Sequence, residues 1–291
     1  MSSTLETCIG TCGFSYPYWR GAFYPEELRS AQWLQYYAQH FSSVEINMTF
    51  YRPPSVMMLN QWLTQVPEDF AFTLKASRVI THEKRLQDCG QELVAMWQNF
   101  SPLGKQLHAV LFQIPPSLYL DFDRLKTFVE LLYHSNPLPV HIAFEFRHHS
   151  WYTPEVFKLL SSRGYAIVLH DMPRRGGFSV LTREGLEDTL IGLGTQKMKV
   201  QQWIEYARAS FFYLRLHGTV QGYAFSEYGE RYLRPWAKIG REVLATGVPL
   251  YAYFNNDPDA RATRDAKRFN ALIGLPALKT SVPLRTAPRL F

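Results

Sequence analysis

Short apolar runs recur eight times along the chain and end at polar residues. Each run is rich in Val, Ile, Phe and Tyr and has the length of a β-strand. The eight predicted strands are residues 7–13, 43–47, 70–75, 109–113, 140–147, 165–171, 211–217 and 250–256. Segments with helical periodicity fall between most of them, at residues 31–41, 55–65, 91–100, 123–134, 154–163, 200–209, 231–245 and 258–273. Strands that alternate with helices are typical of a parallel sheet with helical crossovers.

The number of these units predicts an α/β protein with a single (β/α)8 TIM-type barrel. A doubly wound open sheet is the alternative, but the first strand exit, Gly10-Thr11-Cys12-Gly13, lacks the third glycine of a dinucleotide-binding turn. We therefore expect no nucleotide cofactor. One domain is expected over residues 1–291, with the barrel at about 7–274 and a C-terminal extension at 275–291. The long connection 171–209 is expected to add an excursion near the barrel mouth.

Composition and charge narrow the class of protein. Lys and Arg number 31 against 25 Asp and Glu, so the net charge of +6 suits an anionic small molecule or a nucleic acid as partner. The 3 cysteines are too few for a disulfide framework, which favours a reducing, cytoplasmic location. No apolar run reaches the roughly 18 residues that a membrane span needs, and the first residues do not have the pattern of a signal peptide. The oligomeric state is left open.

Polar residues at the ends of the predicted strands are the candidates for function, because barrel enzymes place their active site at the carboxyl ends of the strands. Side chains two positions apart share a face of a strand. Glu145 therefore shares a face with Arg147, and Arg215 shares one with His217. The structural alternative is that these charges neutralise one another in a polar layer over the barrel. Nearly every strand contributes such a group, which favours a site.

A series of motifs, in order from residue 10 to about 274, resembles the YecE-like family, number 72 among the families of unknown function. The motifs include Gly10-Thr11-Cys12-Gly13-Phe14, Val44-Glu45-Ile46-Asn47, Ile80-Thr81-His82-Glu83, Phe144-Glu145-Phe146-Arg147-His148, Leu214-Arg215-Leu216-His217-Gly218 and Tyr253-Phe254-Asn255-Asn256-Asp257. The resemblance implies a single TIM barrel. It implies no activity, because the family has no established one.

These observations lead to a set of expected site residues. The expected catalytic residues are Glu45, Glu145, His217 and Asp171, and the expected substrate-binding residues are Asn47, Lys75, His82, Arg147, Trp151, Arg215, Asn255, Asn256 and Asp257. Lys and Arg suit phosphate or carboxylate groups, a glutamate suits a general base, and a histidine suits a general acid. We expect Arg215 to be partly solvated and to hold a ligand anion rather than to pair with Glu145.

A metal site is a weaker expectation. Glu145, Asp171 and His217 come from successive strands and could bind a divalent ion, whereas a multinuclear zinc cluster would need more histidines.

Three functions remain open from the sequence. The first is an enzyme that acts by general acid–base chemistry on a phosphorylated sugar, a nucleotide or a nucleic acid. The second is a non-catalytic module that binds a nucleic acid or a metabolite, to which an arginine stripe at Arg261, Arg264 and Arg268 could contribute, although a solvated helix face explains that stripe better. The third is a carbohydrate-active enzyme that uses Glu45 and Glu145 as its pair of carboxyl groups.

Overall fold

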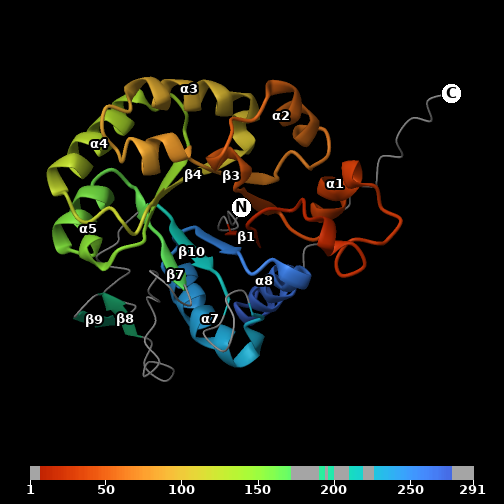
Figure 1. Cartoon of the computed structure of the whole chain (residues 1–291). Coiled ribbons are helices and arrows are strands. Elements are labelled where there is room, and N and C mark those ends of the chain that lie inside the picture. Colours follow the sequence, from red (N-terminus) through yellow and green to blue (C-terminus); the bar gives the residue numbers. More distant parts are fainter. Residues whose placement is uncertain (1–6, 172–189, 194–195, 200–209, 219–225, 277–291) are drawn as a thin grey trace.

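The computed structural model describes residues 7–171, 190–193, 196–199, 210–218 and 226–276 of the 291-residue chain. Parallel strands lie at the centre and helices surround them (Figure 1). The central strands are β1 (Thr7–Thr11), β2 (Ser43–Ile46), β3 (Ala71–Lys75), β4 (Leu107–Ile114), β5 (His141–Phe146), β6 (Ala166–Ile167), β7 (Leu169–Asp171), β10 (Phe212–Leu216) and β11 (Leu250–Phe254).

The strands pair in the order expected for a barrel. One parallel sheet has the order β2-β3-β4-β5-β6 and a second has the order β1-β11-β10-β7. The sheets connect on one side because β6 and β7 are consecutive pieces of a single predicted strand, separated only by Val168. On the other side an isolated parallel bridge joins Cys12 to Glu45, and the Gly13 N–H donates to the Glu45 carbonyl oxygen over 2.7 Å. The eight predicted strands are thus confirmed, in a TIM-type arrangement.

Helices cover the outside of these strands. They are α1 (Trp33–Tyr37), α2 (Val56–Leu63), α3 (Gly90–Phe100), α4 (Phe122–Ser135), α5 (Pro154–Ser161), α7 (Gly229–Ala245) and α8 (Arg261–Leu272). Three of them begin where a side chain accepts a hydrogen bond from the first turn, namely at Ser55, Asp121 and Thr153.

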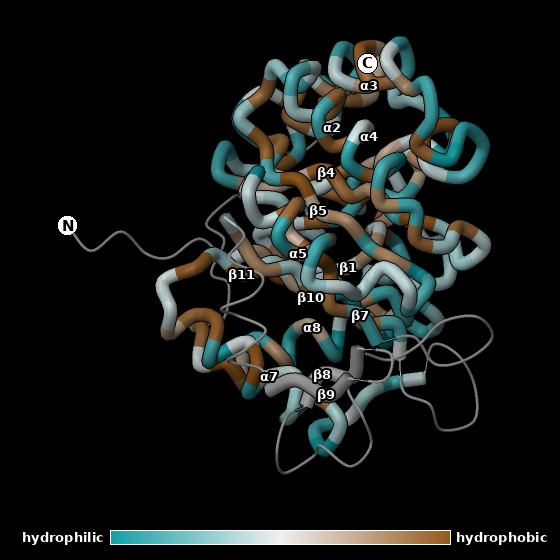
Figure 2. The backbone as a smooth tube through the Cα atoms, turned by 90° about the vertical axis from the view of Figure 1, so that its left-hand side faces the viewer, coloured by the Kyte–Doolittle hydropathy of each residue, from teal (hydrophilic) through white to brown (hydrophobic). Residues whose placement is uncertain are grey.

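Two apolar clusters follow from the alternation of side chains along the strands. The larger cluster joins the outward faces of the strands to the helices. The smaller one contains strand residues together with Cys12, Val168 and Phe211, and it fills the interior of the barrel. Alanines of β3 to β6 line one side of this interior and tyrosines of β10 and β11 fill the other, so small and large side chains face one another. The strands β4 and β5 accordingly run through the middle of the molecule as largely hydrophobic segments (Figure 2).

The helical boundaries differ from the sequence-based expectation at several places. The predicted helix 31–41 is shorter, with a 3-10 turn over Ser30–Gln32 followed by α1. The predicted helix 258–273 is interrupted after Pro258–Ala260, because Asp259 and Ala260 adopt positive φ angles of 54°. The predicted helix 200–209 lies outside the described residues, as does most of the expected extension 275–291.

The long connection 171–209 contains a hairpin that the sequence pattern did not indicate. Its antiparallel strands are β8 (Leu190–Leu193) and β9 (Gln196–Lys199). Elsewhere, no helix among the described residues is long and apolar enough to cross a membrane.

Candidate active site at the carboxyl ends of the strands

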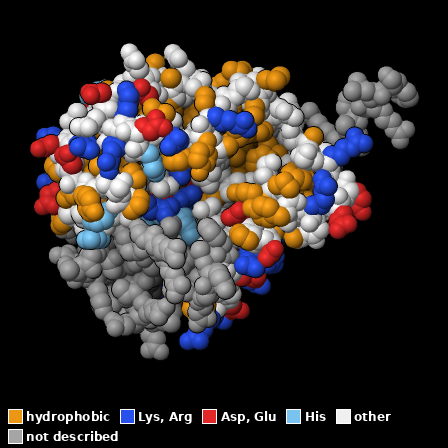
Figure 3. All heavy atoms as spheres, viewed as in Figure 1, with side chains coloured by type: hydrophobic (Ala, Val, Ile, Leu, Met, Phe, Trp, Pro, Cys, Tyr) orange, Lys and Arg blue, Asp and Glu red, His pale blue; other side chains and the backbone are white. Residues whose placement is uncertain are grey.

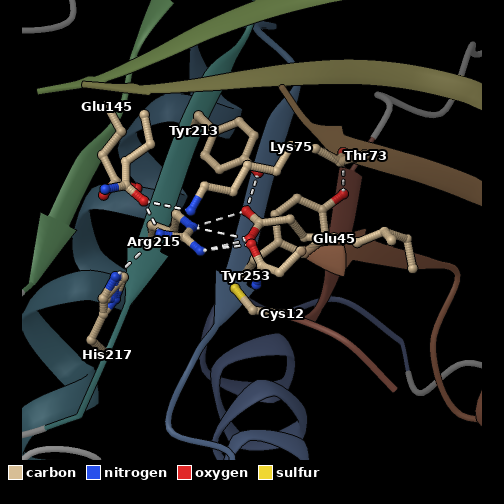
Figure 4. Close-up of polar contacts among 12 residues, drawn as sticks. Cys12, Glu45, Thr73, Lys75, Glu145, Tyr213, Arg215, His217 and Tyr253 are labelled. Atoms are coloured by element: carbon tan, nitrogen blue, oxygen red, sulfur yellow. Dashed lines mark hydrogen bonds and ion pairs between the residues drawn. The ribbon is translucent and has the colours of Figure 1, made fainter. Parts of the chain in front are cut away.

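Six charged or ionisable side chains from β2, β3, β5 and β10 meet above the apolar interior of the barrel (Figure 4). We call this group the mouth cluster; it consists of Glu45, Lys75, Glu145, Arg147, Arg215 and His217. Their positions follow from strand parity. Ala143, Glu145 and Arg147 alternate along and just beyond β5, and Tyr213, Arg215 and His217 do the same along β10. The apolar interior therefore becomes polar at the carboxyl ends of the strands.

Arg215 is the centre of the mouth cluster. Its guanidinium donates to both oxygens of Glu45, with an Nη2–Oε1 distance of 2.7 Å and an Nε–Oε2 distance of 2.9 Å. On its other side Nη1 donates to Oε2 of Glu145 over 2.9 Å. Arg215 is only 2% exposed, and both glutamates are fully buried. A buried charge of this kind is tolerated because it is paired and hydrogen-bonded.

The expectation that Arg215 is partly solvated and holds a ligand anion is therefore wrong. Two carboxylates already surround its guanidinium, which was the structural alternative for this residue. The sequence could not distinguish the two cases, because parity shows that Arg215 faces the interior but not how close Glu45 and Glu145 come to it. A further partner was also missed: the Tyr213 hydroxyl donates to Oε2 of Glu45 over 2.5 Å. Its position two residues before Arg215 was the available signal.

The two glutamates are held in their ionised form. Burial alone would raise the pKa of Glu45, but the adjacent Arg215 guanidinium outweighs burial and lowers it. The pKa of Glu145 is lowered well below its usual value, because Arg147 and Arg215 together outweigh the effect of burial. A glycosidase needs one carboxyl group that stays protonated as the general acid. The pair Glu45 and Glu145 gives that alternative no support.

His217 is fixed in one neutral tautomer. Its Nε2 lies 3.2 Å from Nη2 of Arg147 and 3.3 Å from Nη1 of Arg215. A guanidinium can only donate, so Nε2 must accept and the ring proton must sit on Nδ1. Burial, Arg147 and Arg215 lower the pKa of His217 well below its usual value. Among the described residues no group pairs with Nδ1, so this N–H is a buried donor that a ligand could use.

Lys75 is the cation of the cluster that no described carboxylate neutralises. Its Nζ donates to Oε1 of Gln113 over 2.5 Å and lies 4.0 Å from the centre of the Phe50 ring. The residue is 8% exposed. Burial lowers the pKa of Lys75 to about 8, with a further contribution from Arg215. The mouth cluster carries one more positive than negative charge, since three cations face two carboxylates and His217 is neutral.

Some of the other expected residues lie beside the mouth cluster. Oδ1 of Asn47 is 3.4 Å from Nη2 of Arg215. The ring of His82 packs edge-on against Phe50 at 4.8 Å, on the same ring that Lys75 covers. Asn255 follows β11, and its backbone N–H donates to the Leu216 carbonyl oxygen over 2.7 Å, which places it at the same end of the barrel.

The structure does not bring the remaining expected residues into this group. Trp151 is fully buried, stacks on Phe146 at 4.9 Å and donates to the Leu118 carbonyl oxygen. It packs between the strands and the helix layer. Asp257 accepts from the Tyr18 hydroxyl, so it is engaged outside the cluster.

A second polar network, not expected from the sequence, accounts for Asp171 and Asn256. Asp171 accepts a hydrogen bond of 3.0 Å from the Tyr228 hydroxyl, and the Tyr228 N–H donates to Asp265 of α8. Asn256 donates to the same Asp265 carboxylate over 2.7 Å. This network connects the ends of β7 and β11 to α8, so these residues have a supporting role in the structure.

The expected metal set of Glu145, Asp171 and His217 is not assembled. Both oxygens of Glu145 bind arginines, and Asp171 binds Tyr228. In the part of the chain that the structure describes, no three His, Cys, Asp or Glu side chains are grouped to hold a metal ion.

A cavity of about 430 Å³ lies beside Asn47, and none of the six mouth-cluster residues lines it. Asn47 lines this cavity and also contacts Arg215. Its other walls include Phe14, Met58 and Trp62, together with Arg52. In the space-filling view, basic side chains and histidines gather near the middle of the face, beside a hollow with hydrophobic walls (Figure 3).

The parallel strands, the helix layer and the polar strand ends together define a TIM-type barrel protein with a polar site at its mouth. The chain belongs to the family described as "Protein of unknown function DUF72", whose family model matches residues 8–289. This confirms the family resemblance seen in the sequence motifs.

The names of similar proteins state no activity. The UPF0759 protein YunF of Bacillus subtilis is 26% identical over 275 residues, which cover 87% of this chain and 91% of that protein. The UPF0759 protein YecE of Escherichia coli K12 is 32% identical over 82 residues, or 28% of this chain and 30% of that protein. The crystal structure of a DUF72 family protein from Thermotoga maritima has a TM-score of 0.73 and 27% identity, and the match covers 92% of this chain and 99% of that chain.

Proposed function

We propose that this chain is an enzyme that binds an anionic small molecule of the sugar-phosphate class at the mouth cluster and transfers a proton there. The observation that carries the proposal is the position of Lys75. It is a nearly buried amine beside Arg147 and Arg215, and its direct contacts among the described residues are an amide oxygen and an aromatic ring. An anion brought next to it would gain the attraction that a carboxylate provides at most buried lysines.

The roles of the residues differ from those expected from the sequence. Glu45 and Glu145 are engaged by Arg215 and held ionised, so they are poor proton acceptors and serve as the framework of the cluster. Lys75 has a pKa of about 8 and is the better general base near neutral pH. The Nδ1–H of neutral His217 is a hydrogen-bond donor for a substrate oxygen on which negative charge develops.

The cavity lined by Asn47 supports a substrate larger than a phosphate ion. Asn47 also contacts Arg215, so a ligand whose charged group lies among the cations of the mouth cluster could extend its uncharged part past Asn47. We place this activity in the cytoplasm, because Cys8, Cys12 and Cys89 form no disulfide.

Proton exchange at a substrate carbon tests the proposal. Dihydroxyacetone phosphate is incubated with the protein in D2O, and loss of the signal of its carbon-bound protons is followed by NMR. We expect exchange with the wild type, at a rate that rises with pH through about 8 and above, because the pKa of Lys75 is about 8 in the free protein and a bound phosphate group raises it. Lys75→Met should lower the rate by roughly 100-fold or more, as expected when a general base is removed.

The matched control is Lys105→Met, since Lys105 is exposed and lies outside the mouth cluster. This variant should exchange at the wild-type rate. No exchange above the buffer rate with the wild type, or equal exchange with Lys75→Met, would overturn the proposal.

A further inference from the structure

We propose that Lys75 is a nucleophile that forms an imine with the carbonyl group of the substrate, so that the mouth catalyses amine-based covalent chemistry on an anionic aldehyde or ketone. This inference rests on the proposed function and deepens it. Proton transfer alone requires Lys75 only as a base, whereas the geometry around its amine also suits bond formation to carbon.

The contacts of Lys75 leave its amine able to react. Nζ lies at the end of an extended side chain that reaches from β3 toward Arg215 (Figure 4). Its described hydrogen bond is to Oε1 of Gln113, and its described ring contact is to Phe50. An amide oxygen accepts a hydrogen bond from either a protonated or a neutral amine. Gln113 can therefore orient Nζ without holding it in the charged form, which a carboxylate would do.

The carboxylates near Lys75 are bound to other cations and do not pair with its amine. The glutamates nearest to Lys75 in the mouth cluster are bound to the guanidinium groups of Arg215 and Arg147. Lys75 therefore lies beside two paired arginines and makes no ion pair with a described carboxylate. Desolvation next to cationic groups is the usual means by which proteins activate an amine nucleophile.

The backbone fixes the position of the amine. The Lys75 carbonyl oxygen accepts a hydrogen bond of 2.7 Å from the Thr49 hydroxyl, and the next residue, Ala76, donates its N–H to the Leu111 carbonyl oxygen over 2.9 Å. Lys75 thus starts from a strand end that is held on two sides. A reactive group on such a rigid element is placed well for reaction.

In the free protein the neutral amine of Lys75 is populated under physiological conditions. With a pKa of about 8, roughly one Lys75 side chain in ten is unprotonated at pH 7. For an ordinary lysine with a pKa near 10.4 the unprotonated fraction is lower by a factor of roughly 200 to 300. The lower intrinsic nucleophilicity of a weaker base offsets only part of this gain.

The proposed step balances without any further reactant. The Nζ lone pair forms a bond to the carbonyl carbon, and the carbonyl π electrons move to the oxygen, which accepts a proton that Nζ releases. A second proton, from solvent, then lets this oxygen leave as water while the nitrogen lone pair forms the C=N bond. The product is a protonated imine.

Reductive trapping tests the inference on the wild-type protein. The protein is mixed with dihydroxyacetone phosphate or with its neutral analogue dihydroxyacetone, and sodium borohydride is added. Borohydride delivers a hydride to an imine carbon and makes the link permanent. After digestion, mass spectrometry measures labelling of the peptide that contains Lys75, and the peptide with exposed Lys105 serves as an internal reference.

We expect Lys75 to be labelled at least about ten times faster than Lys105 at pH 7, and faster by the phosphorylated ketone than by the neutral one. Lys75→Arg, which keeps the positive charge but cannot form an imine, should abolish the specific label without changing the label on Lys105. Equal labelling by the two ketones would support the nucleophile and contradict the anion site of the proposed function.

The inference is overturned if Lys75 is labelled no faster than Lys105. If the wild type still exchanges the carbon-bound protons of dihydroxyacetone phosphate in that case, Lys75 acts as a base alone. The proposed function would then stand without the imine.

Discussion

Arg215 holds two buried glutamates that otherwise have too few charged partners. Replacing it with methionine fills a similar volume but leaves Glu45 without its arginine, and Glu145 with Arg147 alone. Stranding a buried charge in this way typically costs about 3–5 kcal/mol. We expect Arg215→Met to lower the free energy of unfolding, measured by urea denaturation, by about this amount.

An exposed ion pair provides the control for Arg215. Arg264 binds Glu227 over 3.0 Å, but its side chain is 41% exposed. Arg264→Met should lower the free energy of unfolding by no more than about 1 kcal/mol, because exposed pairs contribute little. Equal losses in the two variants would show that burial of the mouth cluster does not determine its contribution to stability.

Two buried histidines, His217 of the mouth cluster and His170 of β7, make stability depend on pH. Burial and the two arginines lower the pKa of His217 in the folded protein, and burial lowers that of His170 to about 4. In the unfolded chain both residues titrate near pH 6.5. Below pH 6.5 the unfolded chain therefore binds more protons than the folded one, and the free energy of unfolding falls as the pH falls toward 5.

Replacing His217 removes its share of this slope. His217→Gln should make the loss of stability between about pH 6.5 and pH 5 shallower by up to about 1.4 kcal/mol per pH unit. Urea denaturation at a series of pH values measures the slope directly. A His217→Gln slope equal to that of the wild type would mean that His217 is not held neutral in the fold.

At the level of the elements, the contact between β1 and β2 leaves no room for a side chain at Gly10. A Cβ atom on Gly10 would lie 2.1 Å from the Ser43 carbonyl oxygen, so only glycine allows β1 to approach β2 this closely. Tyr37 of α1 reinforces the contact, because its hydroxyl accepts from the Thr11 N–H and donates to the Ser43 carbonyl oxygen. Glu45, which lies in β2, depends on this approach for its position.

Substitution of Gly10 tests the importance of that contact. Gly10→Ala should lower the free energy of unfolding by about 1–3 kcal/mol, the usual cost of forcing extra volume into a packed region. Gly90→Ala is the matched control, since a Cβ on Gly90 would meet nothing within 4 Å, and it should not destabilise the protein. Both values come from denaturant titration. A Gly10→Ala variant as stable as Gly90→Ala would contradict the close approach of the two strands.

The strands, the helix ends and the ion pairs differ in how well the sequence predicts them. Strand identity and parity were predictable, because apolar runs with polar ends are directly visible, and parity correctly placed Arg215 with His217 on the interior face. Helix ends were less predictable. The break at Asp259 depends on a positive φ angle, which the hydrophobic periodicity of the sequence does not reveal. The pairing of Arg215 with Glu45 was not predictable either, since strand order does not give the distance across a barrel.

The distribution of charge over the whole molecule favours the mouth over the outer helices as the anion site. The arginine stripe of α8 is largely neutralised, because Arg264 and Arg268 both bind Glu227 and Arg261 binds Asp259. A nucleic-acid surface on α8 would have to break these pairs. The mouth cluster, in contrast, keeps the surplus positive charge of Lys75 in a nearly buried position.

Proton uptake on anion binding shows whether Lys75 belongs to an anion site. Sulfate is titrated into the protein at pH 8 by calorimetry, in two buffers with different ionisation enthalpies, which gives the number of protons taken up per bound anion. Lys75 is about half protonated at this pH, and a bound sulfate raises its pKa, so we expect an uptake approaching half a proton that disappears in Lys75→Met and persists in Lys105→Met. Sulfate that does not bind, or that binds without proton uptake, would contradict an anion site at Lys75.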